Sequence, residues 1–78
     1  MTKILVIDDD KSICESLNLY LAEEGYEVNT AQSAEEGLRK FQSQPWDLVI
    51  LDIFLSDADG LEILRRLKDK SPDTSVVM

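Results

Sequence analysis

Acidic side chains follow two apolar segments of the chain, and their types suit a cation site. Residues 8–10 are consecutive Asp and come directly after the apolar run 4–7, while Asp52 comes directly after Leu48–Leu51. If both runs are neighbouring strands, the carboxylates lie about 4.8 Å apart. Two charges at that spacing repel by roughly 3.5 kcal/mol at an effective dielectric of 20. We therefore expect the cluster to raise the pKa of one carboxyl group or to bind a cation.

The donor set restricts which cation this would be. All the ligands offered are oxygens, the chain contains no His, and its single Cys, Cys14, is expected to be a small buried hydrophobe. Mg²⁺ fits these oxygens better than zinc does. A carboxylate beside Mg²⁺ is a workable phosphoryl acceptor, because the metal neutralises charge on the transferring group.

The elements that position these side chains alternate along the chain. The two apolar runs are rich in branched residues, which is typical of strands buried on both faces. Strands are expected at residues 4–7, 26–31, 48–51 and 75–78. Helical spacing predicts a helix after each of the first three strands. Such strand–helix–strand units force a parallel sheet with right-handed crossovers, and hence a doubly wound α/β fold.

Each predicted helix has a start signal, and two have a stop signal. Asp10, or alternatively Ser12 with Glu15, is expected to cap the first helix, which ends at Gly25. Ser33 with Glu36 opens the second helix, and Pro45 stops it. Asp59 and Glu62 are expected to cap the third.

Several other side chains are expected to serve structure alone. Asp57 is taken as a turn or cap residue, and Trp46 is expected to pack at the edge of the sheet far from the acidic residues. The expected inward-facing residues of the second and third helices are Leu38, Phe41, Leu61, Leu64 and Leu67.

Two segments of the chain resemble the receiver domain of two-component response regulators. They are residues 3–10, Lys-Ile-Leu-Val-Ile-Asp-Asp-Asp, and residues 51–61, Leu-Asp-Ile-Phe-Leu-Ser-Asp-Ala-Asp-Gly-Leu. The similarity extends through Ser-Pro-Asp-Thr at 71–74. It implies a flavodoxin-like sheet in the order 2-1-3-4-5. It also implies that Asp8 and Asp9 hold Mg²⁺, with Asp9 a direct ligand, and that the backbone carbonyl of Phe54 completes the metal shell. A partner histidine kinase is expected to phosphorylate Asp52, which makes this a regulatory domain rather than an enzyme.

The chain differs from the family pattern in two respects. Ser56 stands where the family usually has Pro, which should loosen that turn. The family's later residues, including a phosphoryl-binding Lys and a switching aromatic, would lie beyond Met78. We therefore expect residues 1–78 to be the N-terminal part of a single receiver domain, in the order 2-1-3-4, without the fifth strand and last helices. An output domain, most often DNA-binding in the family, would be encoded downstream.

Composition excludes some partners and locations. Sixteen acidic against eight basic residues give a net charge of −8, which argues against direct nucleic-acid binding. The apolar runs are too short to span a bilayer, and the first residues do not form a secretory signal, so a cytoplasmic location is expected. An exposed edge on the fourth strand is expected to favour a homodimer or strand exchange.

Other interpretations of the acidic residues remain open at this point. Residues 8–10 also suit a plain helix N-terminus, and Asp52 suits a strand-ending turn. A haloacid-dehalogenase-type phosphatase would use Asp8 as nucleophile and Asp10 as acid–base, but it leaves Asp52 and Gly60 unexplained. A degenerate receiver that acts only as a binding module is a third alternative.

Overall fold

The computed structural model describes residues 2–77 of the chain, and Met1 and Met78 lie outside the described residues. Strands and helices alternate along it, as the sequence predicts. In chain order the elements are β1 (Lys3–Ile7), α1 (Lys11–Glu23), β2 (Glu27–Ala31), α2 (Ala34–Ser43), β3 (Leu48–Leu51), α3 (Gly60–Lys70) and β4 (Ser75–Val77).

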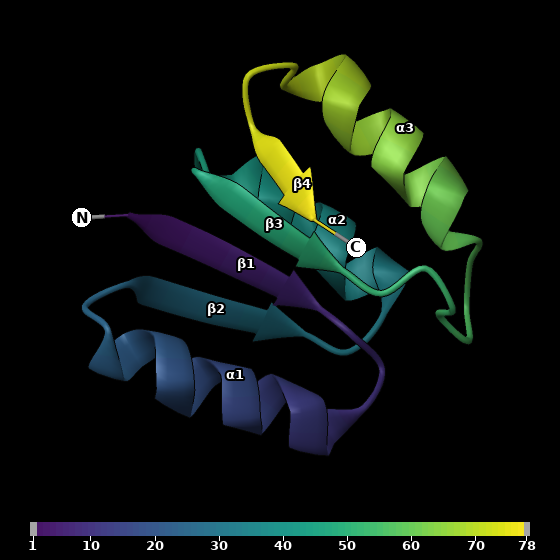
Figure 1. Cartoon of the computed structure of the whole chain (residues 1–78). Helices are drawn as coiled ribbons and strands as arrows, with labels where there is room; N and C mark the ends of the chain where they lie inside the picture. The colour runs from purple at the N-terminus through teal and green to yellow at the C-terminus, as the bar shows by residue number, and fades with distance from the viewer. Residues whose placement is uncertain (1, 78) are drawn as a thin grey trace.

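The strands form one parallel sheet in the order β2-β1-β3-β4 (Figure 1). The predicted doubly wound α/β fold and strand order are thereby confirmed. In the register of the two central strands, Ile7 lies opposite Leu51. The carboxyl ends of β1 and β3 therefore meet at the same edge of the sheet, which is where ligands bind in folds of this type.

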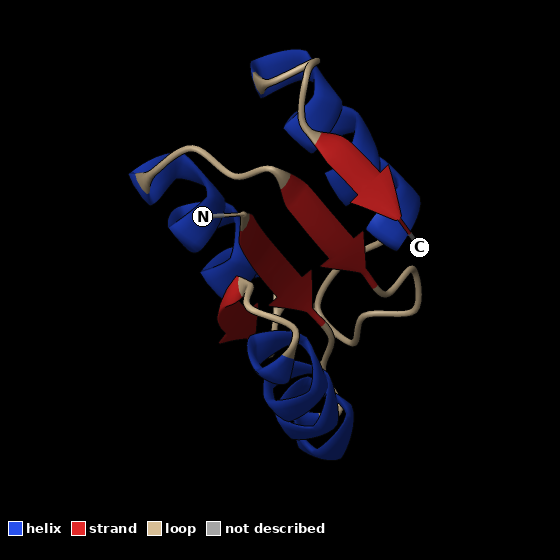
Figure 2. Ribbon diagram, turned by 60° about the vertical axis from the view of Figure 1, so that its left-hand side comes forward, coloured by secondary structure: helices blue, strands red, loops and turns tan. Residues whose placement is uncertain are grey.

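Side chains of a strand alternate between the two faces of the sheet. Each face of this sheet has its own helices (Figure 2). On one face Ile4 and Val6 of β1 pack with Cys14 of α1. On the other face Leu5 and Ile7 pack with residues of α2 and α3, including Phe41 and Leu67. β1 is thus buried on both faces, and the expectation that Cys14 is a buried hydrophobe is confirmed by its exposed fraction of 2%.

The helix ends largely follow the predicted signals. The Asp10 side chain caps α1 by accepting hydrogen bonds from Ser12 N and Ile13 N. Glu15 takes no part in the cap, and its Oε1 lies 3.9 Å from Lys11 Nζ. Gly25 follows the helix with φ +93°, in the left-handed region that favours glycine.

At α2, Ser33 accepts from Glu36 N, but Glu36 reaches back to Gln32 N rather than to Ser33. At α3, Asp59 accepts from Leu61 N, and Glu62 pairs with Arg65 and Arg66 instead of capping.

The prediction that Leu61 faces the core is wrong, because 55% of its surface is exposed. The buried residues of α3 are Gly60, Ile63 and Leu67, with Leu64 partly buried beside them. These positions follow the spacing i, i+3, i+4 and i+7 of a single helical stripe, and Leu61 is one residue off that stripe. The second strand likewise begins at Glu27, one residue later than predicted.

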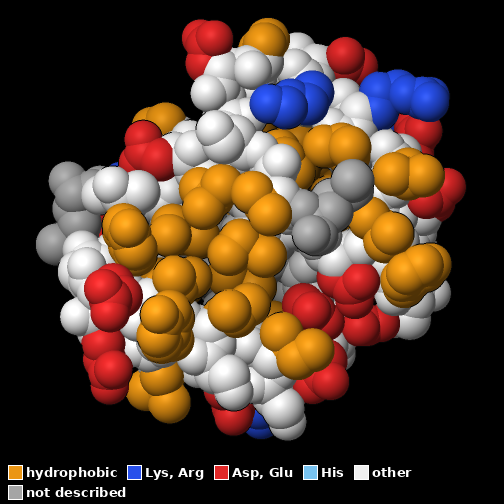
Figure 3. All heavy atoms as spheres, viewed as in Figure 1, with side chains coloured by type: hydrophobic (Ala, Val, Ile, Leu, Met, Phe, Trp, Pro, Cys, Tyr) orange, Lys and Arg blue, Asp and Glu red, His pale blue; other side chains and the backbone are white. Residues whose placement is uncertain are grey.

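The sheet face that carries α1 is only partly covered. Leu48 and Ile50 of β3 are partly buried against this side of the core, and Val77 of β4 is 53% exposed. Figure 3 shows apolar side chains gathered in the middle of this face, beside α1. β4 is the outermost strand of the sheet, so its far edge has no partner strand in the described residues.

Candidate metal centre

Two strand ends bring the predicted acidic residues together. The parallel hydrogen-bond ladder continues one residue past β1 and β3: Asp8 N donates to Ala31 O at 3.0 Å, and Asp52 N donates to Ile7 O at 2.9 Å. These bonds fix the backbones of both Asp residues at the carboxyl edge of the sheet. Asp9 and Asp10 then lead into α1, which begins at Lys11.

The side chains of Asp8, Asp9 and Asp52 converge on one point. One carboxylate oxygen from each residue lies within 4.8 Å of the others. Asp8 and Asp52 are half-buried and Asp9 is exposed, so the cluster is open to solvent on one side. Oxygen-only donors on a partly solvated edge fit a hard divalent cation such as Mg²⁺.

Each of these carboxylates has one oxygen held by a backbone N–H. Asp10 N donates to Asp8 Oδ1 at 2.9 Å, and Phe54 N donates to Asp52 Oδ1 at 3.0 Å. Asp9 Oδ2 accepts from Ser56 N at 3.1 Å. In the described residues the second oxygen of each group accepts no hydrogen bond, so one oxygen per residue is available to a cation. The residues present therefore fit the metal that the acidic cluster suggests.

The electrostatics of Asp8 reflect both its burial and its neighbours. Burial is the main cause that raises the pKa of Asp8, and the hydrogen bond from Asp10 N opposes this. The charges of Asp52 and Asp9 raise the pKa of Asp8 further. The expected upward shift is present, although desolvation contributes more to it than the repulsion between carboxylates.

Behind Asp8, the Cys14 thiol donates to the Asp8 carbonyl at 3.2 Å. Burial, followed by the Asp8 charge, raises the pKa of the Cys14 thiol and favours its neutral form.

The loop between β3 and α3 carries Phe54, whose side chain is 81% exposed. This loop closes on itself at Gly60, whose N–H donates to Ile53 O at 3.1 Å. A Cβ on Gly60 would lie only 2.2 Å from Ile53 Cα, so only glycine allows this approach. Because Ile53 stands between Asp52 and Phe54, Gly60 sets the path of the backbone at the site. The role of the Phe54 carbonyl as a metal ligand stays a prediction.

Asp57 has a structural role that extends the expected one. Its carboxylate accepts from Ala34 N at 2.9 Å and from Glu35 N at 3.2 Å, so it caps α2 rather than its own loop. The Ala34 N–H is the main cause that lowers the pKa of Asp57. This contact joins the loop after Asp52 to the start of α2.

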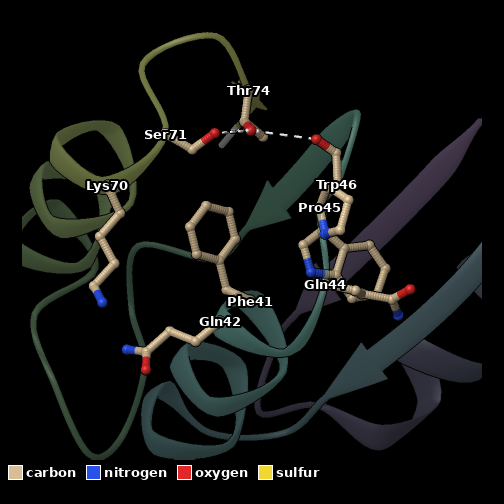
Figure 4. Close-up of a pocket in the computed structure, with 8 residues that line it drawn as sticks. All are labelled: Phe41, Gln42, Gln44, Pro45, Trp46, Lys70, Ser71 and Thr74. Atoms are coloured by element: carbon tan, nitrogen blue, oxygen red, sulfur yellow. Dashed lines mark hydrogen bonds between the residues drawn. The ribbon is translucent and has the colours of Figure 1, made fainter.

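The opposite edge of the sheet has a pocket of about 230 Å³ between the C-terminal ends of α2 and α3 (Figure 4). Trp46 is buried there with its Nε1 donating to Lys40 O at 3.1 Å, which confirms its predicted packing role. Ser71 and Thr74 share a hydrogen bond of 2.7 Å, and Thr74 Oγ1 donates to Trp46 O at 3.2 Å. These bonds tie the start of β4 to the start of β3.

Two contacts at the site were not predicted from the sequence, the Ser56 N–H to Asp9 and the Asp57 carboxylate to α2. Ser56 and Asp9 are 47 residues apart, and Asp57 and Ala34 are 23 apart. No local pattern signals partners at such separations. Only the departure of Ser56 from the Pro of the family pattern could have directed attention to a free N–H there.

Comparison with known proteins identifies the family. Residues 4–78 match the family of response regulator receiver domains, and the chain belongs to it. The transcriptional regulatory protein DltR of Streptococcus agalactiae is 36% identical over 75 residues, which are 96% of this chain and 34% of DltR. The chain thus spans about a third of the length of this relative.

Solved structures agree with that assignment. A CheY-like receiver domain from Methanospirillum hungatei superposes with a TM-score of 0.96 at 37% identity, over 97% of this chain and 61% of that one. The response regulator TrrA of Thermotoga maritima, crystallised with Mg²⁺ and BeF, has a TM-score of 0.92 at 46% identity, over 97% and 66% of the two chains. TrrA has also been crystallised with the histidine kinase ThkA.

The described residues include no helix with both the length and the hydropathy needed to cross a bilayer.

Proposed function

We propose that Asp52 accepts a phosphoryl group from a phosphohistidine of a sensor kinase, in a Mg²⁺-dependent reaction that switches an output. The observation that carries this proposal is the convergence of oxygens from Asp8, Asp9 and Asp52 within 4.8 Å at the edge of the sheet. The crystal forms of TrrA with Mg²⁺ and BeF, and with its histidine kinase, support it by similarity.

The metal-holding residues are Asp8, Asp9, Asp52 and the backbone carbonyl of Phe54. Mg²⁺ bound there supplies positive charge that offsets the repulsion between the carboxylates and an incoming phosphate. The burial that raises the pKa of Asp8 favours its protonated form, and bound metal would favour the carboxylate.

The chain's own contribution is the orientation of the acceptor. Phe54 N–H holds Asp52 Oδ1 and fixes the orientation of the carboxylate, so that one of its oxygens would bind the cation while the other attacks phosphorus. As the new O–P bond forms, the P–N bond of the phosphohistidine breaks. The imidazole nitrogen leaves with the electron pair of that bond and takes up a proton from solvent. The product is an aspartyl phosphate, an established covalent species.

The role of Asp10 as a helix cap argues against a phosphatase of the haloacid-dehalogenase type. Such an enzyme needs Asp10 as an acid–base, but Asp10 Oδ1 already accepts from Ser12 N and Ile13 N as the cap of α1. Membership of the receiver family also argues against this enzyme. A degenerate receiver is disfavoured because the acidic cluster is complete.

Residues 1–78 are proposed to be the N-terminal part of one receiver domain, since the matched receiver from Methanospirillum hungatei is covered over 61% of its length. The output domain would lie outside this chain, and the name of DltR favours transcriptional regulation. The net charge of −8 argues against nucleic-acid binding by these residues themselves. A cytoplasmic location remains part of the proposal.

For a protein made of residues 1–78, we further propose self-association through the β4 edge. The edge strand is unpaired in the described residues, and apolar side chains of Ile50 and Val77 are accessible beside it. Exposed strand edges of this kind pair with other copies. Sedimentation at increasing concentration should show the mass rise above 8.8 kDa, and a mass that stays there at every concentration would refute the proposal.

The phosphorylation proposal is tested by incubating the protein with acetyl phosphate and Mg²⁺, then mapping the acid-labile phosphoryl group by mass spectrometry. We expect label on Asp52, with none on the Asp52→Asn variant. Label on Asp8 would support the phosphatase-type enzyme instead. No label at all would mean that residues 1–78 are not a phosphoacceptor by themselves.

A further inference from the structure

β2 is the outermost strand at the end of the sheet opposite β4 (Figure 1). The backbone groups of successive residues in a strand point alternately to its two sides. Ala31 O accepts from Asp8 N at 3.0 Å, so the backbone groups of residues 27, 29 and 31 are directed at β1. Those of Val28 and Thr30 are directed at the open edge. Strand edges of this kind can pair with a further strand.

A lysine from α2 lies across this edge. Lys40 Nζ donates to Thr30 O, an outward carbonyl within β2, at 2.5 Å. The same Nζ lies 3.4 Å from Glu36 Oε2, one helical turn earlier in α2. Glu36 Oε1 in turn accepts from Gln32 N, directly after β2, at 2.8 Å. The ammonium group is thus held at the edge by the strand itself and by a carboxylate that is anchored to the end of the strand.

We propose that Lys40 closes the β2 edge to pairing with a strand from a second copy of the chain. An added strand needs Thr30 O as an acceptor, and this oxygen is already bound by the ammonium group. The added strand would have to displace that group or take its charge out of water, and burial of an unpaired charge is costly. Lysine is one of the side chains with which proteins prevent pairing at sheet edges. The inference concerns β2 and does not depend on the proposed phosphorylation.

A similar contact at the other edge of the sheet closes less of the strand. Lys68 Nζ of α3 donates to Thr74 O at 2.6 Å. Thr74 precedes β4, whereas Thr30 lies within β2. Because Ser75 N is directed at β3, the backbone groups of Val76 point to the outer side of β4, where there is no partner strand among residues 2–77. The two edges therefore differ in how far a lysine protects them, and β2 is the more protected.

Hydrogen exchange at the outward amides tests the inference, because it reports on β2 separately from β4. The amide protons of Val28 and Thr30 are followed by NMR at low and high protein concentration in the parent and in three variants. Lys40→Met keeps the aliphatic part of the side chain and removes the charge, whereas Lys40→Arg keeps the charge. Lys11→Met is the matched control, because it removes the charge of an exposed lysine in α1.

We expect exchange at Val28 and Thr30 in Lys40→Met to slow by roughly tenfold or more as the concentration rises, because an added strand pairs these amides. Exchange in the parent, in Lys40→Arg and in Lys11→Met should not change with concentration. The Asn29 amide, which is directed at β1, shows whether each variant is folded. Exchange in Lys40→Met that is independent of concentration would overturn the inference, and so would equal slowing in the parent.

A second measurement uses the parent alone, so it does not depend on whether Lys40→Met folds. The protein is treated with acetic anhydride, and modification of each lysine is followed over time by mass spectrometry. Lys40, held by Thr30 O and Glu36, should react several-fold more slowly than Lys11, whose side chain is 73% exposed. Equal rates for the two lysines would mean that the ammonium group does not stay on the edge, and would overturn the inference.

Discussion

At the scale of single residues, the acidic site is oriented by main-chain groups. Asp8, Asp9 and Asp52 each give one oxygen to a backbone N–H and keep the other free. A side chain held in this way loses little further freedom when a ligand arrives, so less ordering entropy opposes binding. The burial of Asp8 and the repulsion between the carboxylates are then costs that the folded protein carries without a cation.

Neutralising Asp8 should therefore stabilise the metal-free protein. Each pair of like charges about 5 Å apart contributes roughly 1 kcal/mol of repulsion even at the dielectric of water. We expect Asp8→Asn to raise the free energy of unfolding by about 1 kcal/mol without Mg²⁺ and to abolish the stabilisation by added Mg²⁺ that the parent shows. Urea unfolding with and without MgCl₂ measures both effects. Asp69→Asn is the control, and an equal Mg²⁺ response in the parent and Asp8→Asn would contradict the prediction.

Gly60 is expected to be irreplaceable for a steric reason. In Gly60→Ala the new methyl group meets the Ile53 backbone at 2.2 Å, and backbone cannot move aside as a flexible side chain does. We expect a loss of roughly 1–3 kcal/mol of stability, together with weaker Mg²⁺ binding, because Ile53 lies next to Asp52. Thermal unfolding and a MgCl₂ titration measure the two losses.

Gly25→Ala provides the matched comparison. A Cβ at Gly25 would meet no other atom, so the only obstacle to a side chain there is the backbone φ of +93°. Its replacement should lower stability by roughly 1–2 kcal/mol with no change in Mg²⁺ affinity. If Gly60→Ala bound Mg²⁺ as tightly as Gly25→Ala does, the link between Gly60 and the site would be wrong.

At the scale of elements, the start of α2 collects side chains from two parts of the chain, residues 33–36 and Asp57. Ser33 accepts from Glu36 N, Asp57 accepts from Ala34 N and Glu35 N, and Glu36 accepts from Gln32 N. The first N–H groups of a helix have no partner within the helix, so each bond to them satisfies a group that would otherwise need water. The helix start and the loop after Asp52 are consequently a single hydrogen-bonded unit.

Glu36 makes this unit sensitive to acid. The hydrogen bond from Gln32 N is the main cause that lowers the pKa of Glu36 below its ordinary value of 4.5, and the charge of Lys40 lowers it further. A carboxyl group with a lower pKa in the folded state stabilises the protein above its unfolded pKa, and this contribution is lost as pH falls through the folded pKa. We expect the parent to exceed Glu36→Gln in stability at about pH 6–7, with the difference shrinking below about pH 4. Urea unfolding across this range tests it, and a difference that is independent of pH would count against it.

The sequence predicted the order of the elements and the place of the site better than it predicted individual contacts. Apolar runs ending in Asp8 and Asp52 locate the carboxyl edge of a buried parallel sheet, because alternation of strands and helices leaves few other arrangements. Strand order came from the family resemblance. Leu61 of α3 was predicted to be buried and is exposed. A helix with leucines at several positions offers two overlapping apolar stripes, and the sequence alone does not show which one faces the core.

At the scale of the whole molecule, burial is uneven between the two faces of the sheet. The face with α2 and α3 holds the larger cluster of buried residues, whereas Leu48 and Ile50 on the face with α1 stay partly accessible. A sheet face of this kind, next to an edge that has no partner strand among residues 2–77, is where contacts between copies are expected.

A single charge on the edge strand should prevent that association. Val77 is paired in register with Ile50 and is 53% exposed, so a Lys there is solvated in the monomer and places a charge on the edge strand, which opposes pairing with another copy. We expect Val77→Lys to stay monomeric at concentrations where the parent associates, as measured by sedimentation equilibrium. Ser75→Lys, at the other end of the strand, tests whether position matters. If Val77→Lys associated as strongly as the parent, association through the β4 edge would be wrong.

The main chain and the side chain of Phe54 have separate roles. Its N–H orients Asp52, the proposed acceptor, while its ring is 81% exposed and takes part in neither buried cluster. Substitutions of the ring can therefore alter the surface beside the site without altering the amide that the site uses. Descendants of such a sequence could diversify their partners by changing this side chain while inheriting the same chemistry, and duplicated copies could diverge in recognition without first losing activity.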